Sequence, residues 1–176
     1  MAVAHPEWGG RGLAEARALE AAQAVEVYNR GCQVGGDRAD GFWHLDRLLE
    51  EGRRLTLCAT DDAHFSEPDH FGGWTMVKAE QNAPEALLAA LKQGHSYAST
   101  GPAIHNVIWS DSEVVVECSA AASVIVQGKG CAAVAQHGES MTRVTVPLAR
   151  FVNSPWLRLT VVDRAGKRAW TNPVWK

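Results

Sequence analysis

The chain has 176 residues, a net charge of −3 and 46% hydrophobic residues, so it can build a core of its own. It has no block of basic residues, and this composition excludes nucleic acid and acidic membrane surfaces as expected partners. No apolar run is long enough for a transmembrane helix, and Pro6 and Trp8 interrupt the region where a secretory signal would stand.

The four cysteines (Cys32, Cys58, Cys118 and Cys131) are widely spaced and form no C-x-x-C pair. Cys58 and Cys118 lie in strand-like runs, which favours buried, reduced thiols. We therefore predict a cytoplasmic protein. A secreted chain with one or two disulfides is the alternative.

Strand-like and helix-like segments alternate up to about residue 102. A short apolar run at 1–4 comes first, then strands at 24–28, 55–60 and 74–78, a helix at 41–51 and a helix from Pro84 to Gly94. A loop rich in glycine and aspartate is expected from Asn29 to Asp40. The first helix has a leucine stripe that leaves His44 exposed. The second is expected to turn Leu87, Leu88 and Leu91 inward. This rhythm predicts an α/β layer with parallel strands.

From residue 103 onward the pattern becomes strand-like throughout. Apolar and polar residues alternate in the runs 142–146 and 157–162, as in an antiparallel sheet with one wet face. The segments 127–130 and 163–167 have the composition of hairpin turns. We predict two domains, 1–102 and 103–176, the second a small β-sandwich with most of its tryptophans in the core. A sugar-binding sandwich, with those tryptophans exposed, is a weaker alternative.

Three residues are candidate metal ligands. Asp62 and His64 follow the strand 55–60, and His5 follows the apolar run at 1–4. Parallel α/β sheets place their ligand sites at the carboxyl ends of strands, so these side chains are expected to converge. Two imidazoles and a carboxylate suit Zn, Mn or Fe. Taken singly, each motif is also ordinary turn or loop chemistry.

Several short segments, taken in order, resemble one known family. They are Ala4-His5-Pro6, Val25-Glu26-Val27-Tyr28-Asn29, Asp61-Asp62-Ala63-His64, Gly73-Trp74 and Tyr97-Ala98-Ser99-Thr100-Gly101-Pro102. In this order they are similar to the polymerase and histidinol phosphatase (PHP) superfamily, in the branch that carries a C-terminal β-sandwich. The resemblance implies a distorted β/α barrel with a metal centre, and mostly phosphoester hydrolysis by water that the metal activates.

The resemblance also implies roles for single residues. His5, Asp62 and His64 match metal ligands of that family, and Glu26 and Asn29 match positions that line the floor of the site. Asp61 is either a neighbouring catalytic acid or a turn residue.

His70, in the loop after the D-x-H motif, is placed by its position as a residue that faces substrate, with an exposed loop histidine as the alternative.

The H-x-H motif that opens this family is absent from the sequence. The resemblance thus covers the C-terminal half of the barrel, truncated before its first motif, and three ligands cannot build a two-metal clamp. We expect a partial divalent-metal site for a small phosphorylated or ester substrate, completed by a missing N-terminal half or by a homodimer. The alternative is a non-catalytic interaction module without turnover.

Overall fold

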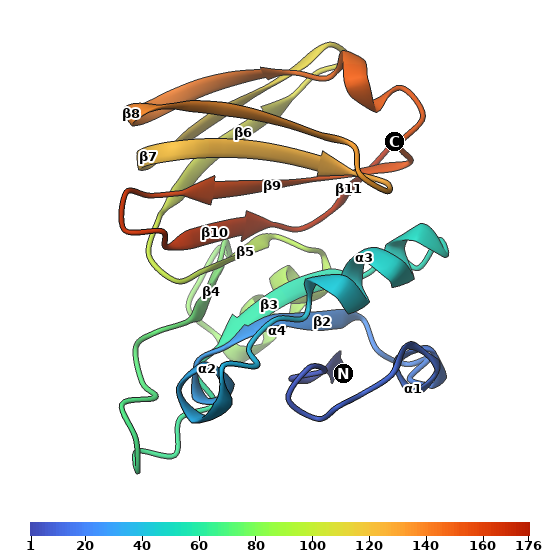
Figure 1. Cartoon of the computed structure of the whole chain (residues 1–176), viewed down its shortest axis with the longest axis vertical. Helices are drawn as coiled ribbons and strands as arrows, with labels where there is room; N and C mark the ends of the chain where they lie inside the picture. Colours follow the sequence, from blue (N-terminus) through green and yellow to red (C-terminus); the bar gives the residue numbers. More distant parts are fainter. The chain divides into compact units, whose positions relative to one another are not determined.

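The computed structural model describes all residues from 1 to 176, and the chain divides into two compact units, 1–98 and 99–176. The predicted boundary lies at 102/103, a few residues further on. The fold is mixed α/β with more strand than helix, and its elements are drawn in Figure 1. None of the helices has the length and apolar composition that spanning a bilayer requires.

The first unit contains a small parallel sheet in the order β1-β2-β3. Its strands are β1 (Ala2–Val3), β2 (Ala24–Asn29) and β3 (Thr56–Thr60). Val25 lies opposite both Val3 and Leu57, and all three are buried. The parallel arrangement predicted from the sequence is confirmed. As a result the carboxyl ends of all three strands point the same way.

Three helices connect these strands: α1 (Leu13–Ala18), α2 (Arg30–Gly36) and α3 (Phe42–Glu50). Leu45, Leu48 and Leu49 of α3 are fully buried, which contributes roughly 1.5–3 kcal/mol for each side chain. Gly41 precedes α3 because a Cβ there would lie 2.0 Å from the carbonyl oxygen of Glu26. Glycine at this position lets α3 begin directly against β2.

Two local predictions in this region are wrong. The segment after Asn29 was expected to be a loop, but it forms α2, because Asn29 caps the helix with its side chain. His44 was expected to be exposed, but it is buried, and its Nε2 lies 2.7 Å from the carbonyl oxygen of Arg11. This carbonyl, from a residue far away in the chain, pairs with Nε2, while Nδ1 of His44 is buried without a partner. Helical spacing alone does not reveal the contact.

The rest of the first unit is a β-α-β segment made of β4 (Trp74–Val77), α4 (Pro84–Lys92) and β5 (Ser96–Ser99). The prediction that α4 turns its leucines inward is wrong for Leu88 and Leu91, while Leu87 is half-buried. Ala90 is the buried residue of this helix, while Leu88 is 53% exposed and Leu91 36% exposed. Ala89 beside Ala90 is exposed and Ala86 is half-buried, so only a narrow part of the surface of α4 is covered.

The second unit is a curled antiparallel sheet. Its strands are β6 (Ile104–Trp109), β7 (Glu113–Gly128), β8 (Ala133–Pro147), β9 (Trp156–Val162), β10 (Arg168–Thr171) and β11 (Val174–Trp175), with a 3-10 turn at Ala149–Phe151. β7 pairs with β6, β8 and β9, and both predicted hairpin turns are confirmed.

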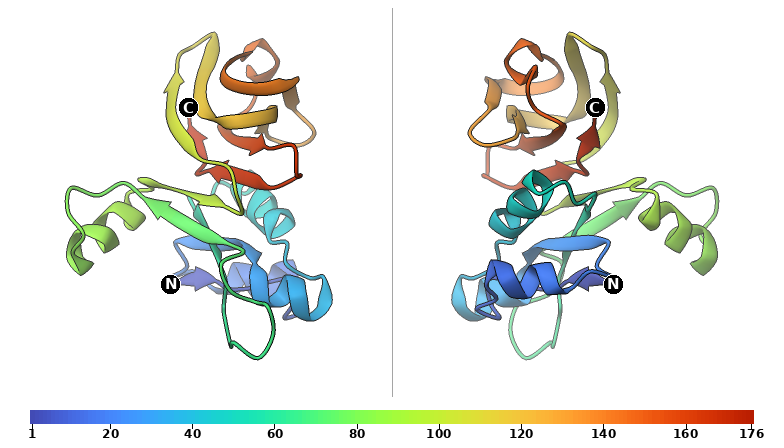
Figure 2. Two further views of the ribbon diagram at one scale, coloured as in Figure 1. Left: turned by 90° about the vertical axis from the view of Figure 1, so that its left-hand side faces the viewer. Right: turned by 90° about the vertical axis from the view of Figure 1, so that its right-hand side faces the viewer.

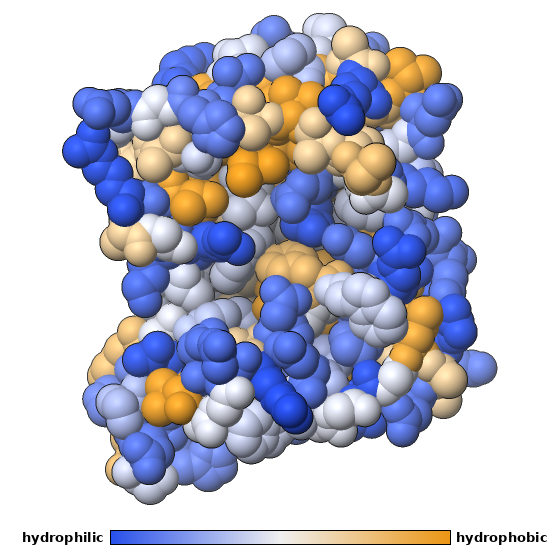
Figure 3. Space-filling view, viewed as in Figure 1, coloured by the Kyte–Doolittle hydropathy of each residue, from blue (hydrophilic) through white to orange (hydrophobic).

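Two tryptophans of the second unit, Trp156 and Trp170, are buried, as predicted for core residues. Figure 3 shows hydrophobic side chains at the surface over the strands at the top of the view, where the curled sheet is not covered by a helix. Among the large hydrophobic residues of this unit, Ile108 of β6 is 50% exposed.

Candidate functional site

A chain of hydrogen bonds joins the carboxyl ends of β2 and β3. The side-chain nitrogen of Asn29 lies 3.3 Å from Oε2 of Glu26 and 3.2 Å from Oδ2 of Asp62. Glu26 and Asn29 are buried, with exposed fractions of 5% and 0%, while Asp62 is exposed at the surface. One amide therefore bridges a buried carboxylate and an exposed one.

The orientation of the Asn29 amide follows from its place in the chain. Asn29 is the last residue of β2 and the N-cap of α2, and its Oδ1 accepts a hydrogen bond from the backbone N–H of Cys32 at 2.9 Å. Because the oxygen serves as the helix cap, the NH₂ group must face the two carboxylates. A single residue thus begins a helix and organises the site.

Glu26 is a buried carboxylate without a cationic partner. Its Oε2 accepts from the backbone N–H of His5 at 2.6 Å, and its Oε1 accepts from the hydroxyl of Thr60. None of the ion pairs in the structure includes Glu26. Hydrogen bonds alone therefore stabilise this carboxylate inside the unit. Burying a carboxylate without a cation costs folding free energy.

The two cysteines beside this charge have raised pKa values. Burial, together with the nearby carboxylates of Glu26 and Asp62, raises the pKa of Cys32 to about 11. Burial and the charge of Glu26 raise the pKa of Cys58 to about 12. Both thiols stay protonated at neutral pH, and neither is an activated nucleophile.

His5 lies at the end of β1 with an unusual backbone conformation and an unsatisfied ring nitrogen. Its φ angle is 29°, and its Nδ1 is buried without a hydrogen-bond partner. A buried polar atom without a partner is rare in folded proteins and requires an explanation. A neutral imidazole nitrogen without a partner can serve as a metal ligand, and Nδ1 of His44 is in the same state.

The carboxylate of Asp61 is occupied by the loop that follows it. It accepts backbone N–H groups from Phe71, Gly72 and Gly73 at 2.5, 2.8 and 2.8 Å. These bonds fold the segment 61–73 back onto the end of β3. Of the two readings left open by the sequence, this geometry favours the turn residue. A catalytic role for Asp61 remains a prediction.

His64 is anchored through its backbone rather than its ring. Its N–H donates to Asp69 at 2.7 Å, while its side chain is 72% exposed and its Nδ1 lies 4.0 Å from Oδ2 of Asp69. Hydrogen bonds from the backbone N–H of His64, and to a smaller extent from that of Phe65, lower the pKa of Asp69 below its usual range. Asp69 therefore fixes the path of the chain on which His64 is carried.

Asp62 and His64 line the same open pocket, with a volume of about 190 Å³. The other lining residues that carry side chains are Trp8, Cys32, Ser66, Glu67 and Asp69. Three of the lining side chains are carboxylates and none is a lysine or arginine. This charge pattern suits a cation better than an anion.

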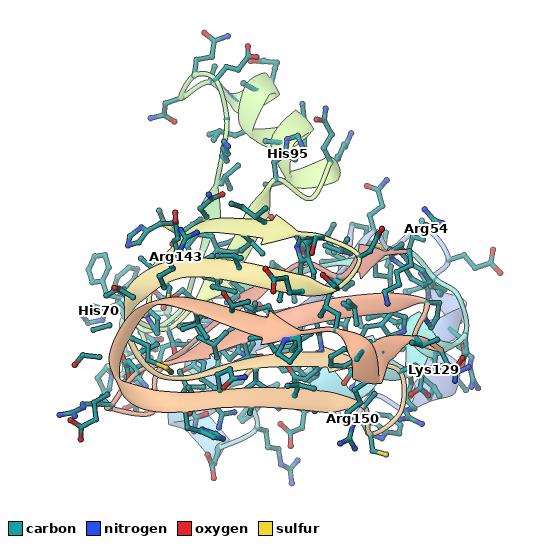
Figure 4. All side chains as sticks on the ribbon, turned by 90° about the horizontal axis from the view of Figure 1, so that it is seen from above. Arg54, His70, His95, Lys129, Arg143 and Arg150 are labelled. Carbon is teal, nitrogen blue, oxygen red and sulfur yellow. The ribbon has the colours of Figure 1, made fainter.

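His70 lies outside this pocket. Its ring stacks on Phe65, with centroids 5.9 Å apart, and meets Phe71 edge-on at 5.6 Å. Both phenylalanines are exposed, by 78% and 88%, and Figure 4 shows His70 at the margin of the molecule. The three rings form an aromatic cluster at the surface of the loop.

The predicted ligands are thus brought together in part. Asp62 is linked to His5 through Asn29 and Glu26, and to His64 through the shared pocket. Their side chains do not form a group of three or more positioned to hold a metal ion. In donor chemistry they fit a divalent cation, since His5 has an unsatisfied imidazole nitrogen and Asp62 is an exposed carboxylate.

Two residues important for this geometry were missed by sequence reasoning. Asp69 holds the backbone of the loop, and Thr60 donates to Glu26 from the last position of β3. The Pro68-Asp69 dipeptide is a turn signal that points to Asp69. The position of Thr60, just before Asp61 at a strand end, is a weaker signal for a residue of the site.

No family model matches the chain, and neither the curated proteins nor the solved structures contain a significant match to it.

Proposed function

We propose that the first unit forms part of a divalent-metal centre in a phosphoester hydrolase of the PHP type. The observation that carries the proposal is the Glu26–Asn29–Asp62 network, in which two carboxylates share one amide without a cation. The unsatisfied Nδ1 of His5 lies on the residue whose backbone N–H binds Glu26. Carboxylate and imidazole donors together match Zn, Mn or Fe.

In this proposal His5, Asp62 and His64 hold the cation. Glu26 and Asn29 support them from below, because the Asn29 amide fixes the carboxylate of Asp62 while its oxygen caps α2. A substrate-facing role for His70 rests on its position in the loop after the D-x-H motif, since its ring lies against Phe65 and Phe71 outside the pocket. A divalent cation bound there would activate water and neutralise charge on the phosphoester.

Three protein ligands suffice for one catalytic zinc with an open position, but not for a two-metal clamp. We therefore propose that further ligands come from another polypeptide segment or chain, and that the parallel strands β1 to β3 correspond to part of a distorted β/α barrel. The expected substrate is a small phosphorylated compound or ester. On its own, the chain is expected to turn over such substrates slowly.

The test is hydrolysis of p-nitrophenyl phosphate and bis-p-nitrophenyl phosphate with added Zn²⁺, Mn²⁺ or Fe²⁺. The informative variant is Asp62→Asn, and its matched control is Asp37→Asn. Both residues are exposed aspartates with positive φ, at 49° and 55°. We expect slow, cation-dependent hydrolysis in wild type and in the control, and its loss in Asp62→Asn. Hydrolysis that does not depend on the cation, or that is equal in both variants, contradicts the proposal.

A second candidate is an interaction module without turnover. It is favoured by the exposure of Phe65 and Phe71, since exposed aromatic side chains of this size commonly mark contact surfaces. If cations bind but no phosphoester is hydrolysed, this candidate takes precedence. Its own test is the paired change Phe65→Ser and Phe71→Ser, which should abolish partner binding without altering cation affinity.

A further inference from the structure

Helix α4 presents an apolar stripe to solvent. Leu88 is 53% exposed and Leu91 36% exposed, and these residues are three apart, so they lie on one face. The opposite face carries Ala90, the buried residue of the helix. An exposed pair of leucines on a short helix is unfavourable unless another surface covers it.

The position of α4 leaves this stripe accessible. In both views of Figure 2, α4 lies at the end of an arm built by β4 and β5, away from β1, β2 and β3. Figure 4 labels His95, which lies next to this helix. Its main packing partner in the first unit is β4. The stripe therefore faces away from the core of its own unit.

Two opposite charges flank the stripe. Glu85 is in the first turn of α4 and Lys92 is in the last turn. They are seven residues apart, which places them on the same side of the helix at equivalent heptad positions, about 10.5 Å apart along its axis. Neither side chain takes part in the ion pairs of the structure.

We propose that α4 pairs antiparallel with α4 of a second copy of this chain. A two-fold axis through the middle of the stripe places Leu88 and Leu91 of one helix against those of the other. The same rotation sets Glu85 opposite Lys92 of the second copy, and Lys92 opposite its Glu85, because flanking positions stay on the same side of the pair. In a parallel pair the flanks of the two copies lie on opposite sides of the seam, so Glu85 would not face Lys92 of the second copy.

The charges thus specify both the partner and the orientation. Glu85 lies near the start of α4 and Lys92 near its end. Two copies of the helix therefore bring opposite charges together only when they run antiparallel. Antiparallel helix dipoles favour the same orientation. The helix is nine residues long, so the contact is smaller than a standard stable interface. The dimer is accordingly weak, with a dissociation constant on the order of 100 μM.

Charge reversal tests this pairing in sedimentation velocity experiments over a concentration series. Glu85→Lys and Lys92→Glu should each raise the dimer dissociation constant by about tenfold or more, since each change converts two attractions into two repulsions. Mixing the two single variants should restore association as a heterodimer, because one copy then carries only lysines and the other only glutamates. The double variant Glu85→Lys/Lys92→Glu should dimerise like wild type.

Matched controls are Glu20→Lys and Lys129→Glu, which make the same changes of net charge at exposed positions outside α4. They should leave the dissociation constant unchanged, and circular dichroism should show that every variant is folded. A wild-type chain that stays monomeric up to millimolar concentration overturns the proposal. So does a dimer that both single reversals leave intact, or a mixture that fails to associate.

Discussion

The side-chain nitrogen of Asn29 donates to Oδ2 of Asp62 at 3.2 Å, which ties the carboxyl end of β2 to the loop after β3. The same amide reaches Glu26, and its oxygen caps α2. One side chain thus neutralises part of the repulsion between two carboxylates while it begins a helix. The integrity of the site depends on this amide being a donor rather than another acceptor.

Replacing the donor by an acceptor should therefore be costly. Asn29→Asp keeps the helix cap but places a third carboxylate against Glu26 and Asp62, so we expect unfolding to become easier by about 3 kcal/mol at pH 7. The loss should shrink as the pH falls, since protonation of one carboxylate relieves the repulsion. Denaturant unfolding at several pH values measures both effects.

Divalent cations should also rescue Asn29→Asp, because a bound cation compensates the added charge. The matched control is Asn82→Asp, at an exposed loop position, which should change stability by less than about 0.5 kcal/mol and show no rescue. A variant at Asn29 that is as stable as wild type at pH 7 would mean that the bridging amide is unimportant.

The three backbone hydrogen bonds of Asp61 give a separate prediction. Asp61→Ala leaves the N–H groups of Phe71, Gly72 and Gly73 without their acceptor. We expect these amides to lose about 2 kcal/mol of protection, which is roughly a thirtyfold faster hydrogen exchange. Exchange at His64 should be unaffected, since its acceptor is Asp69. Unchanged exchange at 71–73 would contradict the structural role of Asp61.

Asp69 should make the loop sensitive to acid. Hydrogen bonds from His64 and Phe65 lower the pKa of Asp69 below its ordinary value of 3.8. The stabilisation is therefore present above pH 3.8 and is lost as the pH falls through the lowered pKa. Amide exchange at His64 and Phe65 should accelerate in that window. Asp69→Asn should remove this pH dependence, and a wild-type loop equally protected at pH 2 and pH 6 would disprove the assignment.

Thiol labelling at pH 8 should separate the cysteines. Cys131 is exposed, while the pKa of Cys32 is raised to about 11 and that of Cys58 to about 12. Only about one Cys32 thiol in a thousand is then ionised. We expect one fast-reacting thiol, which Cys131→Ser removes, and slow reaction of the others until the chain unfolds. Fast labelling of Cys32 in the folded protein would contradict this account.

The strands that carry the candidate ligands could be predicted from the sequence. The apolar segments at 24–28 and 55–60 predicted β2 and β3, and the residue types around Asp61 are typical of a turn. Parallel pairing was predicted because strand-like and helix-like segments alternate. The antiparallel sheet after residue 103 was predicted from period-two alternation. These features are local, so short windows of sequence contain them.

What could not be predicted depends on contacts between distant residues. The burial of His44 requires the carbonyl of Arg11, and the burial of Ala90 in place of Leu88 depends on which side of α4 meets the strands. The network around Glu26 requires Thr60 and the backbone of His5, from separate strands. The spacing of residues along the chain does not show which distant residues will contact one another.

The most direct test of the metal site is the cation content of the purified chain, measured by elemental mass spectrometry after equilibration with Zn²⁺, Mn²⁺ or Fe²⁺ and removal of free ions. The account predicts about one cation per wild-type chain and per Asp37→Asn chain, and a clear loss in Asp62→Asn and His64→Ala. No bound cation under any condition, or equal content in all four proteins, would contradict a metal centre at the ends of β1, β2 and β3.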